Sequence, residues 1–260
     1  YSSIEADMLE ALPLLPEAEP IPTRPTLPAA YAFLARFYLV LGNYEKVYRY
    51  SDSCLLLRHE LMDYNGLTSI PQFNREVIFH SSLLYSVLSA VGTIHPEILA
   101  AYPENDLRNT ELYIYPLNGT KAFWGNYTGI YLRFGGLATD EVYLMRAEAL
   151  TRLGRWQAAL DDLNFLLEHR FLTGTFQPVT ANNAAEVLDM VILERRKELL
   201  FRGLRQLDLW RLNKEGRNII VRRSFEGEQF ELLPNSPLYT MPIPDQIIDL
   251  HPGMEQNPRQ

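Results

Sequence analysis

Leu41-Gly42-Asn43-Tyr44-Glu45 and Leu153-Gly154-Arg155-Trp156-Gln157 are two stretches of one pattern, and they decide the fold of this chain. In each, a glycine follows a leucine and precedes an aromatic residue by two positions. Glycine adopts the left-handed conformation that ends a helix at little cost. The pattern therefore predicts two places where one helix stops and a second begins at once.

The residues around each glycine predict a helical hairpin. Apolar spacing predicts a helix over 29–41, and Asn43 is a suitable N-cap for a second helix over 44–57. In the later hairpin, Thr139 is the expected N-cap of a helix that runs to Leu153, and the partner helix covers 156–169. The predicted hairpins span 29–58 and 139–170.

The two hairpins align without gaps, and Ala35 then falls on Ala147. A small residue, a glycine turn and an aromatic residue are typical of a tetratricopeptide unit, in which two helices approach closely. The hairpins are much further apart in sequence than the roughly 34 residues of adjacent repeats. Residues 62–138 are therefore an irregular insertion, with short β-like runs such as 76–80.

The remaining segments complete a mostly α-helical chain with loop-rich insertions, treated as one domain over 1–260. Residues 183–203 and 204–213 are expected to be helical, and 219–221 and 229–233 to pair as a β-hairpin. Two proline-rich segments, 12–28 and 234–260, are expected to be extended and to wrap the surface. The lone cysteine, Cys54, is expected to be buried as a small apolar residue.

Composition and motifs exclude several functions. The formal net charge of −8 makes nucleic acid an unfavourable partner, and no apolar stretch reaches the length of a membrane-spanning helix. The five histidines are scattered without the spacing of a zinc site, and no nucleophile elbow, phosphate loop or dinucleotide motif is present. We therefore expect no catalytic residues, no metal and no cofactor. An acidic pair of the glycosidase kind stays open, because carboxylates are plentiful.

A dense polar cluster over 194–211 allows two interpretations. Its arginines and glutamates could surround an anionic ligand. The favoured interpretation is structural: ion pairs that lock two helices together against Asp208, because apolar residues alternate with the charges at core spacing.

The aromatic residues between 113 and 134 are the preferred ligand contacts. They lie among glycines in a segment without a regular period, so a helical core does not readily absorb them, and sugar rings stack on such flat faces. The leading candidates are Trp124 and Tyr127. The second rank holds Tyr131, Tyr113 and Tyr115, since alternation of the last two could also mark a half-buried strand.

Several segments resemble, in order, the C-terminal part of the SusD/RagB family of nutrient-binding outer-membrane lipoproteins. Each is weak alone, but together they cover residues 24–258. They include Arg24-Pro25-Thr26, Glu76-Val77-Ile78-Phe79, Asn105-Asp106-Leu107-Arg108, Asp140-Glu141-Val142-Tyr143-Leu144-Met145-Arg146-Ala147-Glu148-Ala149, Glu194-Arg195-Arg196-Lys197-Glu198-Leu199, Pro242-Ile243-Pro244 and Gln256-Asn257-Pro258. Arg202 departs from the family's usual Glu, so one ion pair at that helix junction is expected to be arranged differently.

This resemblance implies a non-catalytic protein anchored at the outer surface of the outer membrane. Such proteins capture glycans or, in some members, peptides, and deliver them to a SusC-like TonB-dependent transporter. The resemblance also implies a longer protein, with membrane attachment only through an N-terminal lipid that lies outside this chain. Two alternatives stay open from the residues: a tetratricopeptide-type adaptor that binds peptide tails, and an all-α glycoside hydrolase.

Overall fold

The computed structural model describes residues 1–83, 92–117, 119–125, 127–129, 132–251 and 253–259. Their contacts divide the chain into two compact units, Tyr1–Arg205 and Gln206–Gln260, and each is described by itself. None of the helices in the described part combines the length and apolar character that a membrane crossing requires.

The first predicted hairpin is confirmed. Helix α2 (Leu27–Leu41) starts two residues before the predicted position, because the side chain of Thr26 caps it and Pro28 lies in its first turn. Gly42 ends the helix with a φ of 72°. The Asn43 side chain then accepts a hydrogen bond from the Lys46 N–H and caps helix α3 (Tyr44–Leu57).

The second hairpin is also confirmed, with one correction at its start. It consists of α6 (Thr139–Arg152) and α7 (Trp156–Glu168), and Gly154 between them has a φ of 78°. The prediction that Thr139 caps α6 is wrong. Its hydroxyl donates to the Glu60 carbonyl at 2.7 Å instead, and so ties the start of α6 to the segment that follows α3.

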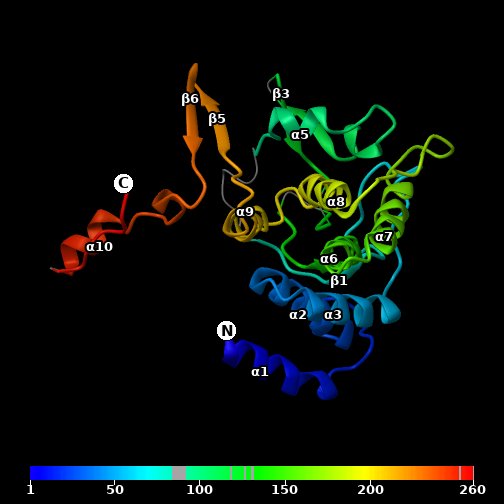
Figure 1. Ribbon diagram of the computed structural model, residues 1–260. Helices are drawn as coiled ribbons and strands as arrows, with labels where there is room; N and C mark the ends of the chain where they lie inside the picture. The colour runs from blue at the N-terminus through cyan, green and yellow to red at the C-terminus, as the bar shows by residue number, and fades with distance from the viewer. Residues whose placement is uncertain (84–91, 118, 126, 130–131, 252, 260) are drawn as a thin grey trace. The chain divides into compact units, whose positions relative to one another are not determined.

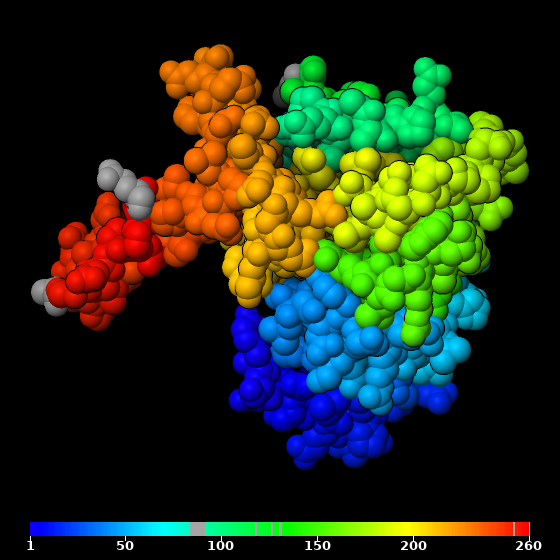
Figure 2. Space-filling view, viewed as in Figure 1, coloured from blue at the N-terminus to red at the C-terminus, as the bar shows by residue number. Residues whose placement is uncertain are grey.

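The two hairpins are neighbours in space although a long insertion separates them in sequence. Helix α3 packs against α6, so α2, α3, α6 and α7 succeed one another as consecutive repeats do (Figure 1). In Figure 2 the lighter blue surface of α2 and α3 lies directly against the green surface of α6 and α7. Ala35 and Ala147 are completely buried, as their positions at close helix contacts require.

Helix α8 (Ala184–Glu198) packs against α6 and α7 and is shorter than predicted. The chain turns after Glu198, because Phe201 and Gly203 both have a positive φ, of 57° and 76°. The glycine signal at Gly203 lies five residues beyond the end of the helix, so helical spacing up to that glycine overestimated its length.

The insertion forms a second hydrophobic cluster beside the helical core. It contains α5 (Pro96–Ala100), the 3₁₀ turn η2 (Leu107–Asn109), and two antiparallel strand pairs. Strand β1 (Val77–Phe79) pairs with β4 (Leu137–Ala138), so an early segment of the insertion meets its C-terminal end. Strands β2 (Ile114–Leu117) and β3 (Thr120–Phe123) form the hairpin that carries the aromatic stretch.

The N-terminal segment adds elements that the sequence analysis did not predict. Helix α1 (Ser2–Ala11) and the 3₁₀ turn η1 (Leu12–Leu14) precede α2. Glu5 of α1 accepts hydrogen bonds from Tyr38 and Lys46, which attaches the helix to the first hairpin.

The C-terminal unit contains α9 (Arg205–Lys214), which starts in the last residue of the first unit, and the β-hairpin of β5 (Val221–Phe225) and β6 (Glu228–Leu232). The turn residues Glu226 and Gly227 both have positive φ, as a tight hairpin turn requires. The 3₁₀ turn η3 (Pro237–Tyr239) and helix α10 (Asp245–Leu250) follow. The hairpin was predicted, whereas α10 was not.

Candidate functional site

The five aromatic residues predicted to contact a ligand occupy different environments. Trp124 and Tyr115 are exposed over 49% and 52% of their surface, whereas Tyr113 and Tyr127 are each only 1% exposed. Tyr131 lies outside the described residues. The two exposed rings are therefore the ones available to a ligand at the surface of the described structure.

Tyr115 and Trp124 come together because of the register of the β2–β3 hairpin. Tyr115 pairs with Ala122, and Trp124 lies two residues beyond Ala122 in the chain. Side chains in this diagonal relation are within reach of each other when they are aromatic. The ring centroids are 6.1 Å apart and the rings are inclined by 43°, which forms an angled aromatic pair.

The backbone beneath this pair is held by hydrogen bonds on both sides. The N–H groups of Trp124 and Gly125 both donate to the Tyr113 carbonyl, at 2.8 and 3.0 Å. On the other side, the Arg133 guanidinium donates to the Phe123 carbonyl at 2.9 Å. Its guanidinium carbon also lies 5.3 Å from the centre of the Phe123 ring. The pair is thus placed on a fixed segment of chain.

Tyr127 belongs to a buried polar network rather than to the exposed pair. Its hydroxyl donates to Glu76 and lies 3.1 Å from a carboxylate oxygen of Asp140. Burial raises the pKa of Tyr127 well above its ordinary value, and the neighbouring carboxylates Asp140 and Glu76 raise it further. Tyr127 therefore stays a neutral hydroxyl that ties the insertion to α6.

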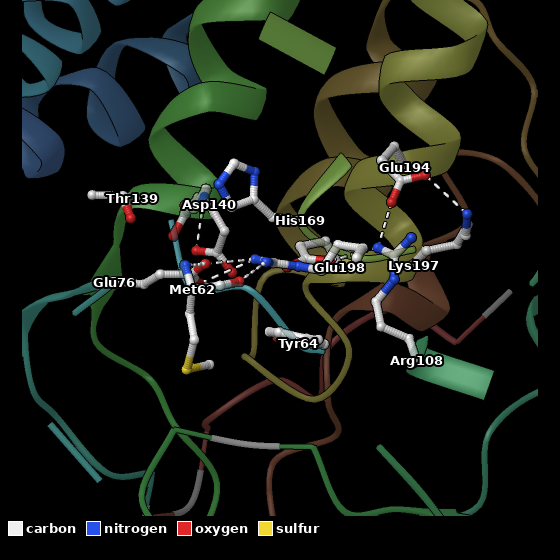
Figure 3. A network of polar contacts seen from close by, with 12 residues as sticks. Met62, Tyr64, Glu76, Arg108, Thr139, Asp140, His169, Glu194, Lys197 and Glu198 are labelled. Atoms are coloured by element: carbon white, nitrogen blue, oxygen red, sulfur yellow. Dashed lines mark hydrogen bonds and ion pairs between the residues drawn. The ribbon is translucent and has the colours of Figure 1, made fainter. Parts of the chain in front are cut away.

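Arg170 lies at the centre of the buried network and joins two carboxylates. It donates to both oxygens of Glu76 at 2.8 and 3.1 Å, and its Nε donates to Glu198 at 2.8 Å. Its third donor group reaches the Met62 carbonyl at 2.8 Å, and its planar face covers the ring of Tyr64. Figure 3 shows Glu198 between the Glu76–Asp140 side of the network and the Arg108–Glu194 side.

Arg108 extends the network on the other side of Glu198. It forms a two-pronged pair with Asp106 at 2.9 and 2.7 Å, and it also donates to Glu194 and Glu198. Lys197 then donates to Glu194 at 2.9 Å. Burial in itself would raise the pKa of Glu198, but Arg170 and Arg108 outweigh it and hold this pKa at about 2.

Arg202, the departure from the family pattern, pairs with Asp140 at the start of α6. One of its nitrogen atoms donates to Asp140 at 3.0 Å and a second also donates to it. The predicted ion pairs of Glu194 and Glu198 are present, but their partners include Arg108 and Arg170, which were not predicted. Further acids, Asp106, Asp140 and Glu76, join the network, and Asp208 pairs with Arg211 inside α9.

The carboxylates Glu76, Asp140 and Glu198 offer oxygens within 4.8 Å of one another, a spacing that a metal ion could use. The surrounding cations argue against that use here. Arg170 binds Glu76 and Glu198, and Arg202 binds Asp140. Charges that are already paired and hydrogen-bonded leave little for a cation to neutralise, so the cluster fits a structural ion network.

Sequence reasoning missed Glu76, Arg108 and Arg170 as members of this network. The sequence held one indication of the Arg108–Asp106 pair, since an acid two residues before an arginine at a turn suggests a local pair. It held no indication of the role of Arg170, because the partners of this residue are Met62, Glu76 and Glu198, which no spacing rule connects to it.

The C-terminal half of the chain matches a known protein family in sequence. A sequence model of the SusD family matches residues 137–259, which contain the second hairpin and the ion-paired helix junction. Over these residues the chain is similar to the SusD family. The family resemblance is thereby confirmed, as is the mostly α-helical, tetratricopeptide-like fold.

Individual proteins are also similar to this chain. A SusD-like protein P38 from Formosa agariphila is 39% identical over 79 residues, 28% of this chain and 16% of that protein. A SusD superfamily structure from Bacteroides vulgatus has a TM-score of 0.72 at 24% identity, over 96% of this chain and 63% of that one. A SusD-like carbohydrate binding protein from the same species has a TM-score of 0.70 at 20% identity, over 94% and 62%.

A laminarin-binding SusD-like protein also matches, with a TM-score of 0.61 at 20% identity over 100% of this chain and 68% of that one. At these identities the solved structures show the shared fold alone. The chain spans 62 to 63% of the length of the first two solved structures that it matches.

Proposed function

We propose that this chain is part of a non-catalytic binding protein that captures glycans at the outer surface of the outer membrane. In this proposal the protein is anchored by a lipid and passes its ligand to a SusC-like TonB-dependent transporter. The observation that carries the binding role is the exposed, inclined pair of Tyr115 and Trp124 on the β2–β3 hairpin.

The physical argument rests on the faces of the two rings. A sugar ring has an apolar face of axial C–H groups, which packs on an aromatic ring, while its hydroxyls stay in water. Two rings 6.1 Å apart can each hold a sugar unit, and their inclination of 43° suits neighbouring units that do not share a plane. A fixed backbone beneath them lowers the entropy lost on binding.

The relatives support a carbohydrate as the ligand. One matched structure is described as a carbohydrate binding protein and another as laminarin binding. Laminarin is therefore the first probe, and starch and cellulose oligomers with differently inclined sugar units follow. A peptide remains the alternative ligand class that the family resemblance implies.

The test is a titration of the chain with laminarin by calorimetry, with Trp124→Ala and Tyr115→Ala beside the parent protein. Losing one stacking ring should weaken binding by about threefold to more than tenfold. The melting temperature should hardly move, because both side chains are about half exposed. The matched control is Trp210→Ala, since Trp210 is 47% exposed and lies in the C-terminal unit.

Equal affinities for the parent and the Trp124 variant, with a fold that stays intact, would remove this pair from the proposal. Tyr131, Tyr113 and Tyr127 are then the remaining predicted contacts. For Tyr113 and Tyr127 a conformational opening would be needed, because both rings are buried.

A further inference from the structure

We infer that Tyr113 is a positioning residue for the aromatic pair, and that it couples Trp124 to the buried end of helix α8. This inference rests on the proposed function and names a residue that sets the geometry of the same site. Tyr113 does not present its ring to solvent, since it is 1% exposed. Its effect on a ligand therefore has to pass through the chain that carries Trp124.

The first part of the argument is the backbone of Tyr113. Its carbonyl accepts the N–H of Trp124 at 2.8 Å and the N–H of Gly125 at 3.0 Å. One oxygen atom thus fixes two successive peptide groups where the chain leaves β3. The direction in which the Trp124 side chain leaves the backbone follows from these two bonds.

The second part is the ring of Tyr113, which lies directly against Gly125. A Cβ atom added at Gly125 would lie only 1.8 Å from Cδ2 of Tyr113 and 2.4 Å from its Cγ. Real Cβ atoms do not approach other heavy atoms so closely, so only glycine allows the ring and the chain after Trp124 to pack in this way. The ring also meets Phe123 edge to face, with centroids 4.9 Å apart.

The third part is the hydroxyl of Tyr113, which fixes the ring to the helical unit. It donates to the carbonyl of Glu198, the last residue of α8, at 2.7 Å. The Glu198 side chain is held in turn by Arg170 and Arg108. The aromatic pair is therefore connected, through one tyrosine, to the most extensively bonded part of the interior.

A neighbouring tyrosine supplies a control that separates positioning from stability. Tyr102 is also buried, and its hydroxyl donates to the carbonyl of Lys197 at 2.8 Å, one residue before Glu198. Both tyrosines thus make the same kind of bond to successive carbonyls of α8. Only Tyr113 receives the backbone N–H groups of Trp124 and Gly125.

The experiment compares Tyr113→Phe with Tyr102→Phe in the full chain labelled with 5-fluorotryptophan. The sequence has three tryptophans, and the Trp124→Phe variant assigns the fluorine resonance of Trp124. Both tyrosine variants should lower the melting temperature by a similar amount. Only Tyr113→Phe should shift or broaden the Trp124 resonance and weaken laminarin binding, by about threefold to tenfold.

Gly125→Ala tests the ring contact independently. The added methyl group has to separate the Tyr113 ring from the chain, so the Trp124 resonance should move further and binding should fall more than in Tyr113→Phe. If this variant does not fold, the comparison of Tyr113→Phe with Tyr102→Phe still tests the positioning role of Tyr113.

The outcomes distinguish this inference from the proposed function. Identical Trp124 resonances and affinities in Tyr113→Phe and Tyr102→Phe would overturn the positioning role, while binding by the parent protein would leave the proposed function standing. If the parent protein binds no glycan, the proposed function fails, and the Trp124 resonance alone still tests the coupling to Tyr113.

Discussion

Arg170 donates hydrogen bonds to both carboxylate oxygens of Glu76, a residue 94 positions earlier in the chain, at 2.8 and 3.1 Å. Glu76 precedes β1 at the start of the insertion, and Arg170 follows α7 at the end of the second hairpin. Both side chains are completely buried. This single pair therefore joins the irregular insertion to the helical repeats.

Replacing Arg170 with methionine should destabilise the protein strongly. The variant leaves Glu76 and Glu198 buried without their shared cation, and breaking a buried pair on one side costs about 3–5 kcal/mol. Chemical denaturation monitored by circular dichroism measures the loss. The control is Arg222→Gln, which removes the exposed pair with Glu231 and should cost less than about 1 kcal/mol.

Similar losses in the two variants would contradict the view that burial makes the Arg170 network important. A loss in Arg170→Met confined to the insertion, with the helical signal unchanged, would show that the insertion unfolds separately from the hairpins.

Replacing Gly42 or Gly154 with valine should cost about 1–2 kcal/mol. Both glycines have φ values in the left-handed region, and a Cβ at either position would meet nothing within 4 Å. The cost is therefore one of backbone conformation and not of a clash. Asparagine tolerates this conformation, so Gly154→Asn should lose less stability than Gly154→Val in the same melting experiment.

Replacing Ala35 or Ala147 with leucine should lower stability by about 1–3 kcal/mol through overpacking. Both positions are completely buried in the hydrophobic core formed by the helical hairpins. The melting temperature is the measurement, and Leu41→Ala, at an exposed position of α2, is the control with little expected change. Unchanged melting temperatures in both leucine variants would contradict the assignment of these two positions to close helix contacts.

Acid should weaken the fold through Glu198. Its pKa is about 2 in the folded protein against an ordinary value of 4.5, so the unfolded chain takes up this proton first as the pH falls. The associated stability, about 3 kcal/mol, is complete above the ordinary pKa and is lost between there and the folded value. In Glu198→Gln this loss should be missing, so its stability should converge on that of the parent as the pH falls from about 5 to about 2.

Asp140 should change the stability with pH in the opposite direction. Burial raises its pKa to about 6, against the opposing effect of Arg202. The folded protein then holds the proton longer than the unfolded chain, and stability falls as the pH rises from about 4 to about 6. Asp140→Asn should remove this slope in urea titrations taken across that interval. A parent protein whose stability does not change in either window would contradict both assignments.

Laminarin and starch should remain intact on prolonged incubation with the chain. The carboxylate cluster of Glu76, Asp140 and Glu198 is buried and bound by arginines, so it offers no acid and base to a glycosidic bond. An assay for released reducing sugar is the measurement. Turnover that disappears on mutation of one Asp or Glu would favour the hydrolase alternative.

The sequence by itself determined the helical hairpins. Gly42, Asn43 and Gly154 act on the residues next to them, through backbone conformation and a local cap, so their effect needs no information about distant segments. The β5–β6 hairpin was predictable for the same reason. Helix α8 was overestimated because it ends at Glu198, before the glycine signal at Gly203, and the chain then turns at Phe201, whose ring stacks on the distant Phe123 with centroids 5.3 Å apart.

Only the tertiary structure decided which aromatic residues stay exposed and which charges pair. Tyr127 and Trp124 are close in the chain and similar in local sequence. Tyr127 is nevertheless buried, with its hydroxyl bonded to Glu76 and Asp140, whereas Trp124 is exposed beside the β2–β3 hairpin. Arg170 likewise acquires its partners from segments far away in sequence. Burial and charge pairing depend on which distant surfaces meet, and a local pattern of residues does not contain that information.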